Sequence, residues 1–139
     1  MLKEDKLYDD LAFYTLAHSG PDFLHQHAVD AYTAQNADES TNAIAVVFAL
    51  VGLYLHIEKG YTGKQVQRAH MVMANRTKAW PKLPTPADRG RIRIEDVLKA
   101  KPGHERDAEI GRWCASVWLS WSESRTAIAA IAREHLGVD

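Results

Sequence analysis

The feature that most constrains this chain is an uninterrupted run of thirteen apolar residues at positions 43–55. The run lies inside a predicted helix over residues 41–59 that is apolar on nearly every side, and a helix of that kind is buried on most sides in a folded protein. A membrane-spanning helix needs about 20 such residues. We therefore expect a core helix in the middle of a bundle, and no membrane partner.

Helical signals surround this central segment. Gly60 is expected to cap its C-terminus, and Thr62 is expected to begin the next helix as an N-cap. Apolar residues in steps of three and four predict an all-α fold class, a five- or six-helix antiparallel bundle that forms a single helical domain over residues 1–139. The predicted helices cover residues 4–17, 21–35, 41–59, 63–78 and 105–136, with a short helical turn at 95–100. Ser120, Ser122 and Ser124 allow a break or kink in the last helix.

A long proline-containing loop is predicted before the last helix, over residues 79–103. Pro81, Pro84 and Pro86 exclude a long helix there, and we expect an ordered flap anchored by Trp80. Acidic residues interrupt the arginines of this segment, which favours a solvated flap over a nucleic-acid-binding surface.

The composition excludes several functions. The formal net charge is −1 and 46% of the residues are apolar, so no nucleic-acid partner is expected. Cys114 is the only cysteine, which excludes a disulfide within this chain and a cysteine-based zinc site. The charged start of the sequence lacks the apolar region of a signal peptide, and we expect a cytoplasmic protein. No phosphate-binding loop or nucleophile motif is present, so the sequence does not decide whether the chain is an enzyme.

Seven histidines are the one unusual feature of the composition. His25, His56 and His70 each lie toward the apolar face of a different predicted helix, and three such imidazoles can hold a divalent metal such as zinc or nickel. The spacings H-x-x-x-H and E-x-x-H, which mark metal sites in bundles, are absent. The alternative, which the sequence favours for each residue singly, is a core histidine that is hydrogen-bonded to its surroundings.

Other side chains suggest further sites. His27 and Asp30 could form a general base, although an exposed pair of little energetic weight is the favoured interpretation. Trp118 lies off the inner stripe of the last helix, which favours an interface, and we expect a homodimer packed through this helix. A small-molecule pocket is also predicted. Its ligand-binding residues would be Tyr32, Trp80 and Trp113.

Several short motifs, which together cover residues 8–121, resemble those of one family of uncharacterised bacterial helical proteins with a domain of unknown function. The resemblance implies a bacterial origin and a helical fold, and it brings no known activity. Many members carry a paired-cysteine segment and two late histidines, which this chain lacks; Ser122, Glu123 and Ser124 stand where the histidines would be. The motifs are FLHQHAVDAY (23–32), LVGLYL (50–55), EKG (58–60), Trp80-Pro81, RIEDVL (93–98) and WCASVW (113–118).

A looser resemblance, of architecture alone, is to the DinB-like helical bundles, which place three histidines around a metal. It implies a metal-dependent hydrolase or thiol transferase as one alternative. Our main prediction is a small-ligand or metal-binding bundle that uses His25, His56 and His70. A homodimeric interaction module without catalysis is the alternative from a different class.

Overall fold

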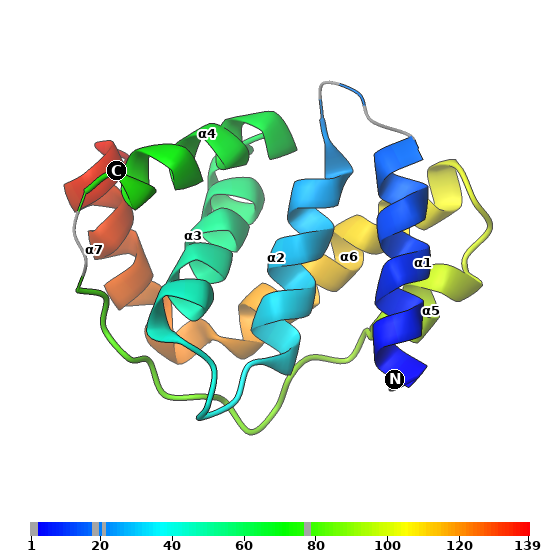
Figure 1. The fold of residues 1–139 in the computed structure, drawn as a ribbon, viewed down its shortest axis with the longest axis horizontal. Helices are drawn as coiled ribbons and strands as arrows, with labels where there is room; N and C mark the ends of the chain where they lie inside the picture. The colour runs from blue at the N-terminus through cyan, green and yellow to red at the C-terminus, as the bar shows by residue number, and fades with distance from the viewer. Residues whose placement is uncertain (1–2, 18–19, 21, 77–78) are drawn as a thin grey trace.

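The computed structural model of the chain describes residues 3–17, 20, 22–76 and 79–139. Over these residues it contains α-helices, one 3-10 turn and no strand, so the expected all-α class is confirmed. In chain order the elements are α1 (Lys3–Ala17), α2 (Leu24–Asn36), α3 (Ala43–Lys59), α4 (Gly63–Ala74), α5 (Ile94–Lys99), α6 (His104–Ser120), η1 (Ser122–Ser124) and α7 (Arg125–Leu136) (Figure 1).

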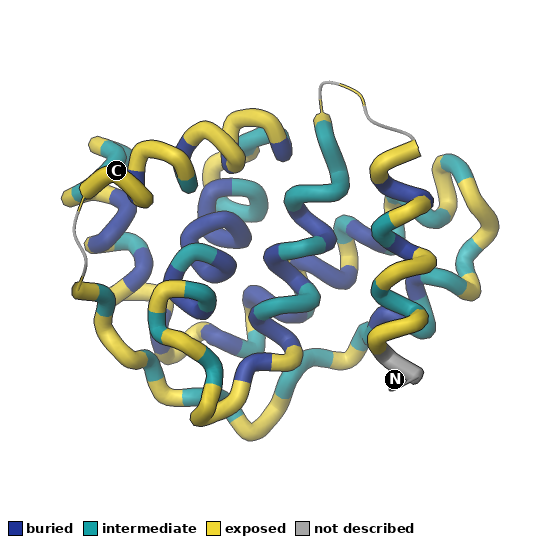
Figure 2. The backbone as a smooth tube through the Cα atoms, in the orientation of Figure 1, coloured by how far each residue is buried: buried dark blue, intermediate teal, exposed yellow. Residues whose placement is uncertain are grey.

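Helices α2 and α3 form the centre of the molecule and run antiparallel to each other (Figure 1). α1 and α5 lie on one side of this pair, α4 and α7 lie on the other, and α6 crosses behind α2. Figure 2 shows that buried residues concentrate where α2, α3 and α6 meet. The core therefore lies between these three helices, and the other helices cover its two sides.

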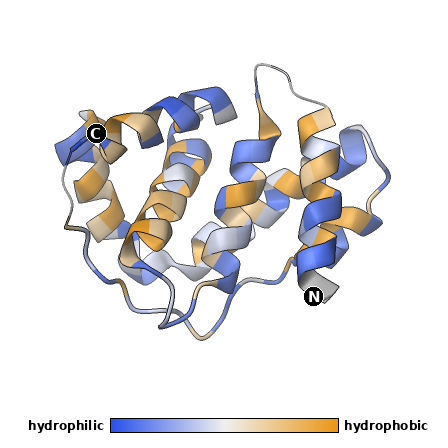
Figure 3. Ribbon diagram, in the orientation of Figure 1, coloured by the Kyte–Doolittle hydropathy of each residue, from blue (hydrophilic) through white to orange (hydrophobic). Residues whose placement is uncertain are grey.

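Helix α3 is the buried centre that its sequence predicts. Nine of its residues are buried, and Figure 3 shows it as an almost continuously hydrophobic helix. The turn into α4 also follows the sequence: Gly60 ends α3 with a φ of 72°, and Thr62 caps α4 by accepting a hydrogen bond from the backbone N–H of Gln65. Across the described ranges, every helix is too short or too polar to cross a membrane.

The last predicted helix, at residues 105–136, is broken into two. Ser120 Oγ donates to the Val117 carbonyl at 2.6 Å, a bond that competes with helical pairing. The Trp121 indole donates to the Ala34 carbonyl of α2 at 3.2 Å, which anchors the chain while η1 turns it into α7. The described ranges therefore hold seven α-helices, and the expected number of five or six is not confirmed.

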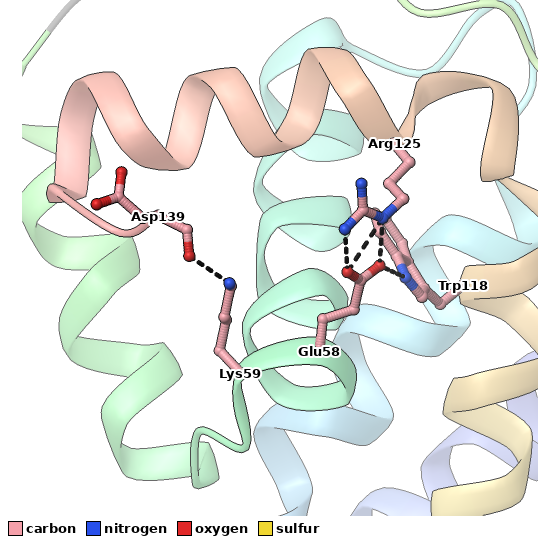
Figure 4. A network of polar contacts seen from close by, with 5 residues as sticks. All are labelled: Glu58, Lys59, Trp118, Arg125 and Asp139. Atoms are coloured by element: carbon pink, nitrogen blue, oxygen red, sulfur yellow. Dashed lines mark hydrogen bonds and ion pairs between the residues drawn. The ribbon is translucent and has the colours of Figure 1, made fainter.

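Glu58 joins the end of α3 to both halves of the broken helix (Figure 4). Its carboxylate accepts from Trp118 Nε1 at 2.8 Å and from Arg125 Nε at 2.8 and 3.0 Å. The Arg125 guanidinium lowers the pKa of Glu58. Next to it, Lys59 Nζ donates to the backbone carbonyl of Asp139. Trp118 is mostly buried within the chain, where Glu58 accepts the hydrogen bond of its indole N–H, and its role in an interface stays a prediction.

Residues 79–93 run along one edge of the molecule, from the side of α4 and α7 to that of α1 and α5 (Figure 1). Trp80 anchors their start, as predicted, with its ring centroid 5.4 Å from that of Phe48 and 5.0 Å from that of His135. This connection leads into α5, where the sequence predicts a short helical turn at 95–100, and the long proline-containing loop predicted over 79–103 is not confirmed.

Gln35, near the end of α2, holds the other end of this segment. Its Nε2 donates to the carbonyls of Ile92 and Arg89 at 2.8 and 3.1 Å. Its Oε1 accepts from Trp113 Nε1 of α6 at 3.0 Å. One buried amide thus joins α2, α6 and the connecting segment.

Candidate functional site

A buried group of polar side chains lies where α2, α3 and α4 meet. His27 and Asp30 of α2 are only 2% and 3% exposed. The expectation of a solvent-exposed pair is therefore wrong, because α2 is covered by α3 on one side and by α6 on another. The thiol of Cys114, on α6, lies 3.6 Å from the His27 carbonyl oxygen.

The imidazoles of His27 and His56 stack on each other, with ring centroids 3.5 Å apart and planes 13° apart. His56 Nδ1 lies 3.1 Å from the Tyr61 carbonyl oxygen. Since a carbonyl oxygen only accepts, this nitrogen carries the hydrogen, and Nε2 of neutral His56 keeps its lone pair. His27 Nδ1 is buried and has no hydrogen-bond partner in the described part of the chain.

Burial keeps both rings of this stack neutral. It lowers the pKa of His27 to about 3, and the neighbouring His56 adds to the effect. The pKa of His56 is also lowered by burial, with its bond to Tyr61 and the charge of Asp22 opposing the shift. Two neutral imidazoles can accept and donate hydrogen bonds without carrying charge.

Asp30, one helical turn after His27 on α2, has a hydrogen-bond partner for only one of its two carboxyl oxygens among the described residues. Gln26 Nε2 donates to its Oδ1 at 3.1 Å, while Oδ2 is buried without a partner among the described residues. Burial raises the pKa of Asp30 well above its usual value, which favours the neutral acid. The carboxyl presses against Gly52 of α3, where a Cβ would lie 1.9 Å from Oδ2. Only a glycine leaves room for it.

The three predicted metal ligands have separate surroundings. His70 Nε2 donates to the Phe48 carbonyl at 2.7 Å, and Thr15 Oγ1 lies 3.0 Å from His25 Nδ1. His56 belongs to the stack with His27. Within the described ranges, no three histidine, cysteine, aspartate or glutamate side chains are close enough to hold a metal ion. A metal site of these histidines stays a prediction that this geometry does not support.

The predicted ligand-binding aromatic residues also lie in three different places. Tyr32 stacks on Tyr8 between α1 and α2, with ring centroids 4.3 Å apart. Trp80 covers Phe48 at the edge of α3, and Trp113 is fully buried in the core. A pocket common to all three stays a prediction.

The His27–His56 stack instead forms part of the wall of an open cleft of about 290 Å³. The cleft lies between the start of α2 and the turn from α3 to α4. Sequence reasoning missed it because it assigned His27 to the exposed side of α2. The signal was present as two histidines on neighbouring helices that run antiparallel. The lining residues are Asp22, Leu24, His27, His56, Gly60, Tyr61 and Thr62.

Comparison with known proteins agrees with the motifs that the sequence carries. The family model described as "Family of unknown function (DUF5946)" matches residues 5–122, and the chain belongs to this family. No curated protein and no solved structure matches the chain. The bacterial origin and the DinB-like architecture stay predictions.

The contact at Gly52 gives a first prediction. Gly52→Ala should lower the free energy of unfolding by about 3 kcal/mol, because the new methyl group would overlap the Asp30 carboxyl in a closely packed interior. Urea denaturation measures this change. Gly111→Ala is the matched control on α6: its Cβ meets nothing within 4 Å, so it should raise stability by about 0.5–1 kcal/mol. Equal effects of the two changes would contradict the close approach.

The buried His27 gives a second prediction, on pH. Its pKa falls from 6.5 to about 3 on folding, so the unfolded chain binds a proton that the native chain rejects. The stability that this difference contributes is complete above pH 6.5 and is lost as the pH falls toward 3, at up to about 1.4 kcal/mol per pH unit. His27→Phe should therefore flatten the acid side of the stability curve, measured by urea denaturation at a series of pH values. An unchanged slope would contradict the neutral buried ring.

Proposed function

We propose that the chain binds a small polar molecule in the cleft beside the His27–His56 stack. One observation carries the proposal: His27 is 2% exposed and leaves a ring nitrogen without a partner in the described structure, and the same side chain lines an open cleft. Clefts that combine apolar walls with a few polar groups are the usual form of small-molecule sites. At about 290 Å³ the cleft suits a ligand smaller than a typical drug.

The energetics of the cluster support a functional role for His27. A buried polar atom without a partner costs about 1–3 kcal/mol, and such costs are typical of sites that serve a function. The neighbouring His70 differs, because Nε2 donates to Phe48 and Gln26 Nε2 lies 3.5 Å from Nδ1. His70 has the surroundings of a structural histidine.

The proposed function is binding alone, without a reaction catalysed by this chain. Cys114 is fully buried, and burial raises the pKa of its thiol. A thiol in such surroundings is a poor nucleophile. The stack supplies neutral imidazoles that can orient a ligand through hydrogen bonds.

Stability measurements provide the first test. His27→Phe keeps an aromatic ring beside His56 and removes the unpartnered nitrogen, so the free energy of unfolding at neutral pH should rise by about 1 kcal/mol. His27→Leu serves as a smaller replacement. The control His70→Phe should lose about 1–2 kcal/mol with its hydrogen bonds. A loss at His27 as large as that at His70 would show a structural role and remove the support for the site.

A fragment screen tests binding directly. Polar fragments are added to protein with ¹⁵N-labelled histidine, and the imidazole signals are compared between the wild type and His27→Phe. We expect fragments that move the His56 signals of the wild type in a saturable way and bind the variant more weakly. A screen in which no fragment distinguishes the two proteins would contradict the proposal.

We also propose self-association through α6 as a second candidate function. Leu119 is 73% exposed and stands beside a mainly apolar cleft of about 330 Å³, whose walls include Ile57, Ala115 and Trp118. Exposed apolar side chains next to an apolar hollow are typical of protein interfaces.

Sedimentation velocity at micromolar concentrations checks this second candidate. The wild type should sediment as a dimer, and Leu119→Glu should shift it toward the monomer because the change places a charge in an apolar contact. Phe13→Glu is the matched control, since Phe13 is 78% exposed on α1 and lies outside the proposed contact. A monomeric wild type, or equal dissociation by both variants, would count against the interface.

A further inference from the structure

We infer that the ligand of the His27–His56 cleft carries a cationic, hydrogen-bond-donating group such as an ammonium. The inference rests on the proposed ligand-binding function and names the chemical class that the site selects. It follows from the charge among the residues that line the cleft, from the lone pair that His56 keeps on Nε2, and from the backbone amides that are already hydrogen-bonded.

The charge of the cleft is negative. Among the described residues that line the cleft, Asp22 is the only acidic one and none is a lysine or an arginine. The Asp22 carboxylate acts on the His56 ring, since its charge is one cause of the pKa of that histidine. Lys64, which follows two residues after Thr62, holds its Nζ over the Phe23 ring, 4.6 Å from the centroid, and is not part of the lining.

The hydrogen-bonding groups of the stack include an acceptor. His56 uses Nδ1–H on the Tyr61 carbonyl, which leaves the lone pair of Nε2 for a donor. His56 and Gly60 lie at the C-terminal end of α3, where the helix dipole adds negative potential. Both features favour a donor that carries positive charge.

An anionic ligand would find few free donors in the same cleft. The starts of α2 and α4 are the two anion-attracting features beside the cleft, and both have amides that are already bonded. At α2, Gln26 N–H donates to the Phe23 carbonyl at 3.2 Å. Gly63 N–H donates to the Asp22 carbonyl at 2.5 Å. In the capping box, Thr62 N–H donates to Gln65 Oε1 at 2.8 Å and Gln65 N–H donates to Thr62 Oγ1 at 3.2 Å.

Three probes that share one ring separate the alternatives: benzylamine, benzyl alcohol and benzoate, which are cationic, neutral and anionic at neutral pH. Each is titrated into protein with ¹⁵N-labelled histidine, and the imidazole signals of His27 and His56 are followed. The signals are assigned with the two His→Phe variants. We expect benzylamine to bind about fivefold more tightly than benzyl alcohol, the effect of one partly exposed ion pair, and benzoate to bind more weakly than either.

A matched pair of charge variants locates the selection. Asp22→Asn should remove the preference for benzylamine over benzyl alcohol and leave the affinity for benzyl alcohol unchanged. Glu39→Gln removes the same charge from the turn between α2 and α3, at the opposite end of this antiparallel pair, and should keep the preference.

Other results would contradict either the selection of a cation or the binding itself. If benzoate or benzyl alcohol moves the His27 and His56 signals as strongly as benzylamine does, the cleft binds ligands but does not select a cation. A preference that survives Asp22→Asn also overturns the inference, because another group would then select the charge. If no probe moves either ring, the cation inference and the proposed function both fail.

Discussion

The close approach of α2 to α3 at Gly52 is the contact on which the rest of the structure depends. The Asp30 carboxyl occupies the space that any other side chain at this position would fill. Because the two helices are this close, His27 and Asp30 are withdrawn from water, and His27 reaches the ring of His56. A slightly wider separation would admit solvent between the helices and would remove the conditions that keep these groups neutral.

The polar cluster then divides into two parts with different roles. Gln26 and His70 have their hydrogen bonds to protein atoms, and they hold α4 against α2 and α3. His27 and Asp30 each keep one polar atom without a partner in the described structure. The satisfied part fixes the geometry. Of the unsatisfied pair, His27 lines the cleft, whereas Asp30 lies in the contact with Gly52. Such a division is what a preformed site requires, since the groups that meet a ligand must be held by others that do not.

The sequence predicts much of the fold because the strongest local patterns agree with the tertiary structure. The apolar segment at 43–55 and the caps at Gly60 and Thr62 are found where their residue types place them. The break at Trp121 is less visible. Three serines allow a break there, but the indole bond from Trp121 to α2, which anchors the chain at this point, cannot be seen in the sequence. The periodicity of apolar residues predicts which face of a helix is buried, but it does not predict which other helices pack against that face.

The candidate site shows the same limit more sharply. A helical wheel places His25 and His27 on different faces of α2 and indicates the side with more apolar residues as the inner one. α2 packs against α1, α3, α4 and α6, so its second face is also covered. His27 therefore takes the position beside His56 that the wheel would give to His25. Three histidines on three helices remain apart because each finds a nearer partner: a threonine hydroxyl, a second imidazole and a backbone carbonyl.

Gln35 has a kinetic consequence for this fold. Its side-chain bonds reach residues that are 54, 57 and 78 positions away along the chain, whereas the α2–α3 pair is connected by a short turn. Closing long loops costs chain entropy before the contact can form, so the neighbouring helices are expected to pair early and the Gln35 amide to find its partners late. Interactions that are absent from the transition state mainly slow unfolding. One buried amide therefore helps to set how long the native chain persists, with little influence on how fast it is reached.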